Sequence, residues 1–174
     1  LVSEFMLQQT TVNTVVKRFN EFIKKWPTSK DLSKINQSSI LKFWSGLGYY
    51  NRAKNLLKTI QIISKNYNYN IPNEYDNLIE LPGIGDYTAK AIMGIAYNKP
   101  VMPLEANIER ILARIYGMKL PLNKIKGELK NKSNFFISKN HSTHLIQSFM
   151  DYGSIICKPR NPDCPNCLIS SKCV

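Results

Sequence analysis

The sequence lacks any apolar run that approaches the roughly 18 residues of a membrane-spanning helix, and it lacks a signal-peptide pattern. Strand-like alternation of apolar and polar residues persists nowhere. Internal repeats and long low-complexity segments are also missing. Apolar residues instead recur with a period of 3.6 along nearly the whole chain, so we predict an all-α fold with no membrane partner.

Acidic residues are scarce. The chain has 12 Asp and Glu against 24 Lys and Arg, which gives a formal net charge of +12. The basic residues are spread over many segments, as expected for a folded binding face rather than a charged tail. A hydrophobic content of 43% is typical of a globular protein. Nucleic acid is therefore the expected partner.

The first residue is Leu1, not Met, and it lies inside an apolar helical pattern. We therefore expect a fragment whose natural N-terminus lies upstream, which leaves targeting open. The favoured location is the cytoplasm of a bacterium, on the nucleoid, and an organelle or a nucleus remains an alternative.

Helix boundaries follow from capping residues, prolines and the apolar period. We expect helices at residues 1–10, 11–26, 31–35, 38–45, 51–65, 75–81, from 87, from 107, and at 122–130 and 141–155. Asn107 is the expected N-cap of the helix that it opens. The proline-bearing loop at 99–103 is the expected lobe boundary, which would place Glu4 and Glu105 on different lobes, facing one cleft.

The stretch Leu81-Pro82-Gly83-Ile84-Gly85-Asp86-Tyr87-Thr88-Ala89 predicts a tight hairpin between two helices. Pro82 stops the first helix, and Gly83 and Gly85 permit positive φ and close approach of a ligand. The N-terminus of the second helix suits an anion, and in a basic chain that anion is a DNA phosphate. A plain glycine turn between packed helices is the alternative.

All four cysteines lie in the last eighteen residues, at Cys157, Cys164, Cys167 and Cys173. This clustering indicates a metal site rather than a disulfide framework. Four thiolates suit either zinc or an iron–sulfur cluster, and the single C-x2-C pair favours the cluster. His141 and His144 are expected to be surface residues, not ligands.

The hairpin, the carboxylate at Glu105 and the C-x6-C-x2-C-x5-C spacing together resemble the endonuclease III superfamily of helix-hairpin-helix DNA glycosylases. Segments 3–10 and 44–53 resemble its MutY family of adenine DNA glycosylases. The resemblance covers the whole chain. It implies a six-helix barrel lobe with the hairpin in residues 1–100, and the catalytic-carboxylate helix with a 4Fe-4S cluster lobe in residues 101–174.

The resemblance also implies the activity, which is hydrolysis of the glycosidic bond of adenine mispaired with 8-oxoguanine or guanine. The enzyme would act as a monomer on double-stranded DNA and would flip the adenine out of the helix. The DNA-binding residues that it implies are Gln9 and Tyr49 as wedges, and Gly83, Gly85 and Thr88 in the hairpin. The four cysteines would hold the 4Fe-4S cluster.

By the same resemblance, Glu4 is the acid that protonates adenine, and burial beside apolar neighbours would raise the pKa of its carboxyl group. Glu105 takes the place of the family's aspartate and would stabilise the cationic sugar. Tyr87 and Asn107 match positions that orient this carboxylate. A helix-start carboxylate without catalytic function is the alternative for Glu4.

The sequence departs from the family at two positions, because Glu105 replaces aspartate and Ala106 replaces glycine. Tyr87 stands where strand-cutting relatives carry a lysine, so we predict a monofunctional glycosylase. The alternatives are an endonuclease III-type glycosylase/lyase acting on oxidised pyrimidines, and a mismatch-binding module without catalysis.

Overall fold

The computed structural model describes all residues from Leu1 to Val174 and consists of helices and turns, with no strand. The all-α prediction is confirmed. None of these helices combines the length and the apolar character that crossing a bilayer requires. The backbone divides into two compact units, Leu1–Gly85 and Asp86–Val174.

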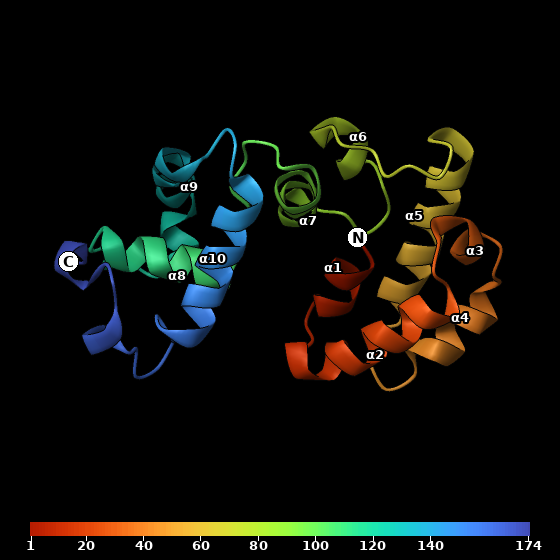
Figure 1. The fold of residues 1–174 in the computed structure, drawn as a ribbon, viewed down its shortest axis with the longest axis horizontal. Helices are drawn as coiled ribbons and strands as arrows, with labels where there is room; N and C mark the ends of the chain where they lie inside the picture. The colour runs from red at the N-terminus through yellow and green to blue at the C-terminus, as the bar shows by residue number, and fades with distance from the viewer. The chain divides into compact units, whose positions relative to one another are not determined.

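The first unit contains six helices (Figure 1). They are α1 (Val2–Leu7), α2 (Val12–Lys25), α3 (Ser29–Ser33), α4 (Gln37–Trp44), α5 (Asn51–Asn66) and α6 (Tyr75–Ile79). Helix α5 packs against α1, α3 and α4, so it forms the centre of this unit. Its predicted apolar stripe is confirmed, since Leu56, Leu57, Ile60 and Ile63 are all buried.

Two short helices of this unit begin earlier than predicted because residues further upstream cap them. Thr28 Oγ1 accepts a hydrogen bond from the N–H of Asp31 at 3.1 Å, so α3 begins at Ser29. The Asn36 side chain accepts from the N–H of Ser39 at 2.9 Å and caps α4. Capping by a side-chain oxygen satisfies N–H groups that have no partner inside a helix.

The second unit contains α7 (Asp86–Ala91), a π-helical segment η1 (Ile92–Ala96), α8 (Ala106–Ile115), α9 (Leu122–Ser133) and α10 (Ser142–Ile155), with short 3-10 turns. Helices α8, α9 and α10 enclose a core that includes Ile108, Leu112, Leu129 and Ile146. Helix α10 lies against α8 (Figure 1), and the absence of a side chain at Gly153 lets it approach Asn107 closely.

The π-helical segment was not predicted from the sequence. Its carbonyl groups at Gly94 and Ile95 accept hydrogen bonds from Thr143 Oγ1, each at 3.1 Å, and Gly94 leaves room for Ile146. These contacts, together with burial of Met102, keep the loop at 99–103 inside the second unit. The division of the backbone at Gly85 therefore differs from the predicted lobe boundary, although Glu4 and Glu105 still belong to different units.

Candidate functional site

The loop between α6 and α7 is the predicted hairpin turn. Gly83 adopts φ +83°, and a Cβ there would lie 2.8 Å from Phe5 Cε1 and 2.9 Å from Asn55 Cβ. Only glycine fits such a position without strain, because other residues rarely adopt positive φ and no space is left for a side chain. The turn is thus built against α1 and α5.

Two side chains hold the carbonyl groups of this turn. Thr59 Oγ1 donates to the Pro82 carbonyl at 2.8 Å, and Gln8 Nε2 donates to the Gly83 carbonyl at 3.2 Å. Gly83 and Gly85 themselves are exposed. Thr88 is only 3% exposed, backbone included, so it offers little surface to a ligand in this structure. The turn therefore presents the backbone of its two glycines to solvent.

The two predicted wedge residues line one open hollow of about 750 Å³, which Gln8, Tyr50, Asn51 and Arg52 complete. Gln9 has φ +57° and Tyr49 has φ +47°. Left-handed backbone in residues other than glycine costs about 1–3 kcal/mol and is enriched at functional sites. The sequence separates these residues by forty positions, and the fold brings them together.

Arg52 holds the two predicted wedge segments together. It is 6% exposed, and its Nη1 donates to the carbonyl groups of Phe5, Met6 and Gln8 at the end of α1. Its Nη2 donates to the carbonyl groups of Leu47 and Gly48 in the turn before Tyr49.

The Arg52 guanidinium also lies 5.5 Å from the Tyr49 ring centroid and 5.6 Å from that of Trp44. Desolvation by burial lowers the pKa of Arg52 from its ordinary value, and Tyr49 acts in the opposite direction. The carbonyl groups around the guanidinium supply the acceptors that a buried cation needs. Arg52 thus links both wedge segments through one rigid group.

Glu4 lies in α1, next to the buried residues Phe5 and Met6. One of its carboxylate oxygens, Oε2, is shielded from solvent. One side of this carboxylate is therefore out of contact with water. Its assignment as the acid that protonates adenine remains a prediction.

The carboxylate of Glu105 caps α8. Its Oε1 accepts hydrogen bonds from the backbone N–H groups of Asn107 and Ile108, each at 2.9 Å. The expectation that Asn107 would cap this helix is wrong, because Glu105 is the N-cap and α8 begins at Ala106. A glutamate side chain is long enough to fold back onto its own helix end, where N–H groups and the helix dipole bind negative charge.

Asn107 has a different partner. Its side-chain oxygen accepts a hydrogen bond from Arg110 Nη2 at 2.8 Å, and the same Nη2 donates to the Gly153 carbonyl at 2.6 Å. Arg110 Nε donates to the Cys157 carbonyl at 2.8 Å. One arginine therefore connects the start of α8 with α10 and with the cysteine loop.

Tyr87 lies in the first turn of α7, followed one turn later by Lys90. The Lys90 ammonium forms an ion pair with Asp86 at 2.8 Å, and its side chain is 18% exposed. The amine nearest in sequence to the predicted catalytic position is therefore held by a carboxylate.

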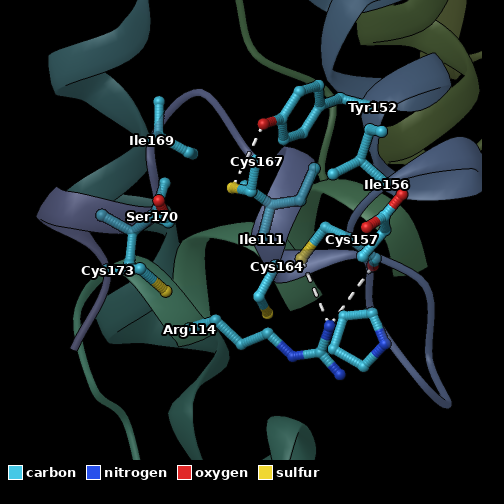
Figure 2. A pocket seen from close by; sticks show the side chains of 13 residues that line it. Ile111, Arg114, Tyr152, Ile156, Cys157, Cys164, Cys167, Ile169, Ser170 and Cys173 are labelled. Atoms are coloured by element: carbon cyan, nitrogen blue, oxygen red, sulfur yellow. Dashed lines mark hydrogen bonds between the residues drawn. The ribbon is translucent and has the colours of Figure 1, made fainter.

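The four cysteines line one cavity of about 230 Å³ between the end of α8, the end of α10 and the C-terminal loop (Figure 2). Burial raises the pKa of the Cys173 thiol, and the nearby Cys157, Cys167 and Cys164 raise it further. Figure 2 shows the sulfur atoms on the inner side of the loop, with the apolar side chain of Ile111 beside them.

Two polar side chains bind sulfur atoms of this set. Arg114 Nη1 donates to Cys157 Sγ at 3.2 Å, and the Tyr152 hydroxyl lies 3.1 Å from Cys167 Sγ. Both groups donate hydrogen bonds, and donors beside sulfur suit thiolates that carry negative charge.

In this structure no three His, Cys, Asp or Glu side chains lie close enough together to hold a metal ion. The four thiols nevertheless line the same cavity, and four thiolates suit either zinc or an iron–sulfur cluster. The two histidines are exposed, at His141 and His144, as predicted.

Residues 2–134 match the family model of the HhH-GPD superfamily base excision DNA repair proteins. The hairpin and Glu105 both lie inside this range, and the cysteine loop lies outside it. The chain belongs to the HhH-GPD superfamily.

Within that class, the similar curated proteins are adenine DNA glycosylases. One from Buchnera aphidicola (subspecies Schizaphis graminum) is 39% identical over 99% of this chain and 50% of its own length. The protein of that name from Arabidopsis thaliana is 33% identical, and that from Homo sapiens is 31% identical. The chain spans about half the length of the bacterial relatives and about a third of the plant and human ones.

Solved structures agree with this fold. A thermostable thymine-DNA glycosylase superposes with a TM-score of 0.82 at 30% identity, over 99% of this chain and 80% of that one. A non-covalent endonuclease III–DNA complex gives the same TM-score and coverage at 23% identity. The predicted helix-hairpin-helix glycosylase fold is confirmed.

Three arginines of the site were not identified from the sequence. Arg52 lies on the apolar face of α5 beside Ala53, and a charged residue on such a face is a usable signal. Arg110 and Arg114 are four residues apart and so share one face of α8, but the chain is basic throughout and their spacing alone does not stand out.

Proposed function

We propose that the chain is the catalytic part of an adenine DNA glycosylase, which hydrolyses the glycosidic bond of adenine mispaired with 8-oxoguanine or guanine. The observation that carries the choice of adenine is the 39% identity to an adenine DNA glycosylase over 99% of the chain. The geometry supports the steps that such an enzyme has to perform on double-stranded DNA.

Extraction of the base is the first step, because a stacked adenine is out of reach of any carboxylate. Gln9 and Tyr49 lie on adjacent loops beside one open hollow, and Arg52 holds both loops. We assign Gln9 and Tyr49 to fill the gap that the flipped base leaves. The exposed backbone at Gly83 and Gly85 would hold a phosphate of the same DNA.

Glycosidic bond cleavage requires protonation of the leaving adenine and stabilisation of the oxocarbenium ion. We assign protonation to Glu4, whose Oε2 is shielded from solvent. We assign stabilisation of the oxocarbenium ion to Glu105, because backbone N–H groups at a helix N-terminus suit a carboxylate that carries negative charge. Asn107 would orient this carboxylate through its backbone N–H, since its side chain binds Arg110, and we assign the same function to Tyr87.

The monofunctional assignment rests on the absence of an available amine. A lyase needs a lysine that forms a Schiff base with the sugar. Position 87 is tyrosine, and the Lys90 ammonium is paired with Asp86. Borohydride treatment during turnover should trap no covalent DNA adduct, and a stoichiometric adduct would favour the endonuclease III-type alternative.

We assign a 4Fe-4S cluster to the four cysteines. Bound there, it would cross-link residues 157–173 into one rigid loop, and the structure shows what that loop holds. Arg114 donates to carbonyl groups of Lys158 and Pro159, and Arg110 connects Cys157 with Asn107. The cluster loop would thereby support the end of α8 that carries Glu105.

Single-turnover release of adenine from an 8-oxoguanine:A duplex tests the proposal, with protein purified anaerobically and its iron content measured. Wild-type protein should release adenine and leave a strand that breaks only in alkali. Glu105→Gln should bind the duplex but release no adenine, since the amide oxygen still accepts the capping bonds but carries no charge. Glu109→Gln, on the same helix, is the matched control and should retain activity.

If the wild-type protein binds the mismatch but releases no adenine, the result would favour the alternative of a mismatch-binding module without catalysis. The additional methylene of Glu105 is the feature that motivates this alternative. It shifts the carboxylate by about 1.5 Å relative to aspartate, and displacements of that size can reduce rates by on the order of a hundredfold.

A further inference from the structure

A positively charged surface lies on α5, beside the hairpin turn. Lys58, Gln61, Ile62, Lys65 and Asn66 line an open hollow of about 390 Å³, and Pro82 of the hairpin completes it. No carboxylate lines this hollow. Because Thr59 hydrogen-bonds the Pro82 carbonyl at 2.8 Å, the hollow and the hairpin turn are held at one fixed distance.

The charges on α5 have one sign. The helix contains no acidic residue over its 16 positions. Lys54, Lys58 and Lys65 are spaced by four and seven residues, so they share one face. The ion pairs of Arg18 with Glu21 and of Lys90 with Asp86 do not involve this helix. A face that carries only cations attracts a polyanion, whereas a surface that serves solubility usually mixes both signs.

The dimensions of this face suit a DNA strand. Eleven residues separate Lys54 from Lys65, which corresponds to about 16 Å along a helix with a rise of about 1.5 Å per residue. Phosphates of one strand advance by about 3.4 Å per base pair along the duplex axis. The face therefore extends over about five such steps. The amide groups of Gln61 and Asn66 add donors for phosphate oxygens.

We propose that Lys58 and Lys65, together with Gln61 and Asn66, form a phosphate-binding site for the DNA backbone that continues the contact made by the hairpin turn. The site reads no base, so it contributes affinity and register on the duplex rather than choice of mismatch. The proposal rests on the DNA-binding function proposed above. It does not depend on adenine as the substrate, nor on catalysis.

The test compares Lys58→Gln/Lys65→Gln with wild-type, cluster-loaded protein by fluorescence anisotropy on a 30-base-pair 8-oxoguanine:A duplex between 50 and 200 mM NaCl. Each phosphate contact contributes about 0.9 to the slope of log affinity against log salt concentration. We expect the slope of the Lys58→Gln/Lys65→Gln protein to be shallower than that of the wild type by about 1.8, which is about 0.9 for each of two lost contacts. Lys24→Gln/Lys30→Gln removes the same charge from exposed positions on α2 and α3 and should leave the slope unchanged.

A slope that stays within 0.5 of the wild-type value, or an equal fall in the control pair, would overturn the proposal. Lys58→Arg/Lys65→Arg should restore the wild-type slope, because guanidinium groups also bind phosphate. Methylphosphonate substitution at single phosphates gives an independent readout. At one or two phosphates, a neutral linkage that weakens wild-type binding should have no effect on the Lys58→Gln/Lys65→Gln protein, and equal weakening of both proteins at every phosphate would refute the site. Since binding is measured, the outcome does not depend on whether adenine is released.

Discussion

Replacement of Arg52 by lysine is the most informative single change in this chain. The substitution preserves the charge and removes the planar fork that reaches two loops at once. In the native structure, Nη1 donates to the Met6 carbonyl at 2.8 Å and Nη2 to the Leu47 carbonyl at 2.8 Å. The single ammonium of lysine can serve one of these carbonyl groups but not both.

The expected decrease in stability follows from the loss of one of these hydrogen bonds. A hydrogen bond to a charged group contributes about 1.5–3 kcal/mol, and an unsatisfied buried carbonyl costs about 1–3 kcal/mol. We therefore expect Arg52→Lys to lower the free energy of unfolding by about 3 kcal/mol. For a chain of this size that corresponds to a fall in Tm of roughly 6–12 °C.

The same change should also impair the base flipping that we propose. Gln9 and Tyr49 hold left-handed backbone conformations, and without Arg52 their loops can relax toward lower-energy conformations. If the poorer positioning of these loops raises the activation free energy by about 1.4 kcal/mol, the reaction becomes tenfold slower. We expect single-turnover adenine release at 20 °C, where the variant is still folded, to slow by about tenfold.

Thermal unfolding and single-turnover release on one preparation test both parts. Arg18→Lys is the control, because Arg18 donates to the Ser45 carbonyl at 2.9 Å from a side chain that is 39% exposed. It should lower Tm by no more than about 2–4 °C, the shift for roughly 1 kcal/mol. An Arg52→Lys protein with wild-type Tm would refute the bonding argument. A destabilised protein with the wild-type release rate would refute the positioning argument.

Two further changes have defined outcomes. Gly83→Ala should lower the free energy of unfolding, measured in urea, by about 2–4 kcal/mol, because the added Cβ meets Phe5 and Asn55 at a position with positive φ. Gly85→Ala is the control: its Cβ meets nothing within 4 Å, so it should lower the free energy of unfolding by less than about 1 kcal/mol. Equal effects of the two substitutions would contradict the steric explanation. Cys167→Ser should lower the bound iron per chain and make the C-terminal loop sensitive to protease, and unchanged iron content would argue against the four-thiolate site.

Much of the helical framework was predictable from local signals. The stripe Leu56, Leu57, Ile60 and Ile63 has a helical period, and the structure buries all four residues. Pro82 and Gly83 marked the hairpin because proline and glycine act through backbone geometry alone. Gly83 does adopt positive φ, whereas Gly85 does not. The cysteine spacing likewise indicated one shared site, and all four side chains do line a single cavity.

Competition between neighbouring groups was not predictable. Asn107 is a good capping residue by type, but Glu105 reaches the same N–H groups and Asn107 binds Arg110 instead. The π-helical segment depends on Thr143, which lies about fifty positions away in the sequence. Local preference is a weak guide where a distant partner supplies a stronger interaction.

The sequence by itself determined the helical class, the hairpin and the clustering of the four cysteines, because hydrophobic period, backbone restriction and residue spacing are local properties. Only the tertiary structure placed Gln9 beside the same hollow as Tyr49, with Arg52 buried between their loops. It alone connected Asn107 to Cys157 through Arg110. These contacts join residues about forty to fifty positions apart, and such pairs form only when the packed core brings their helices together.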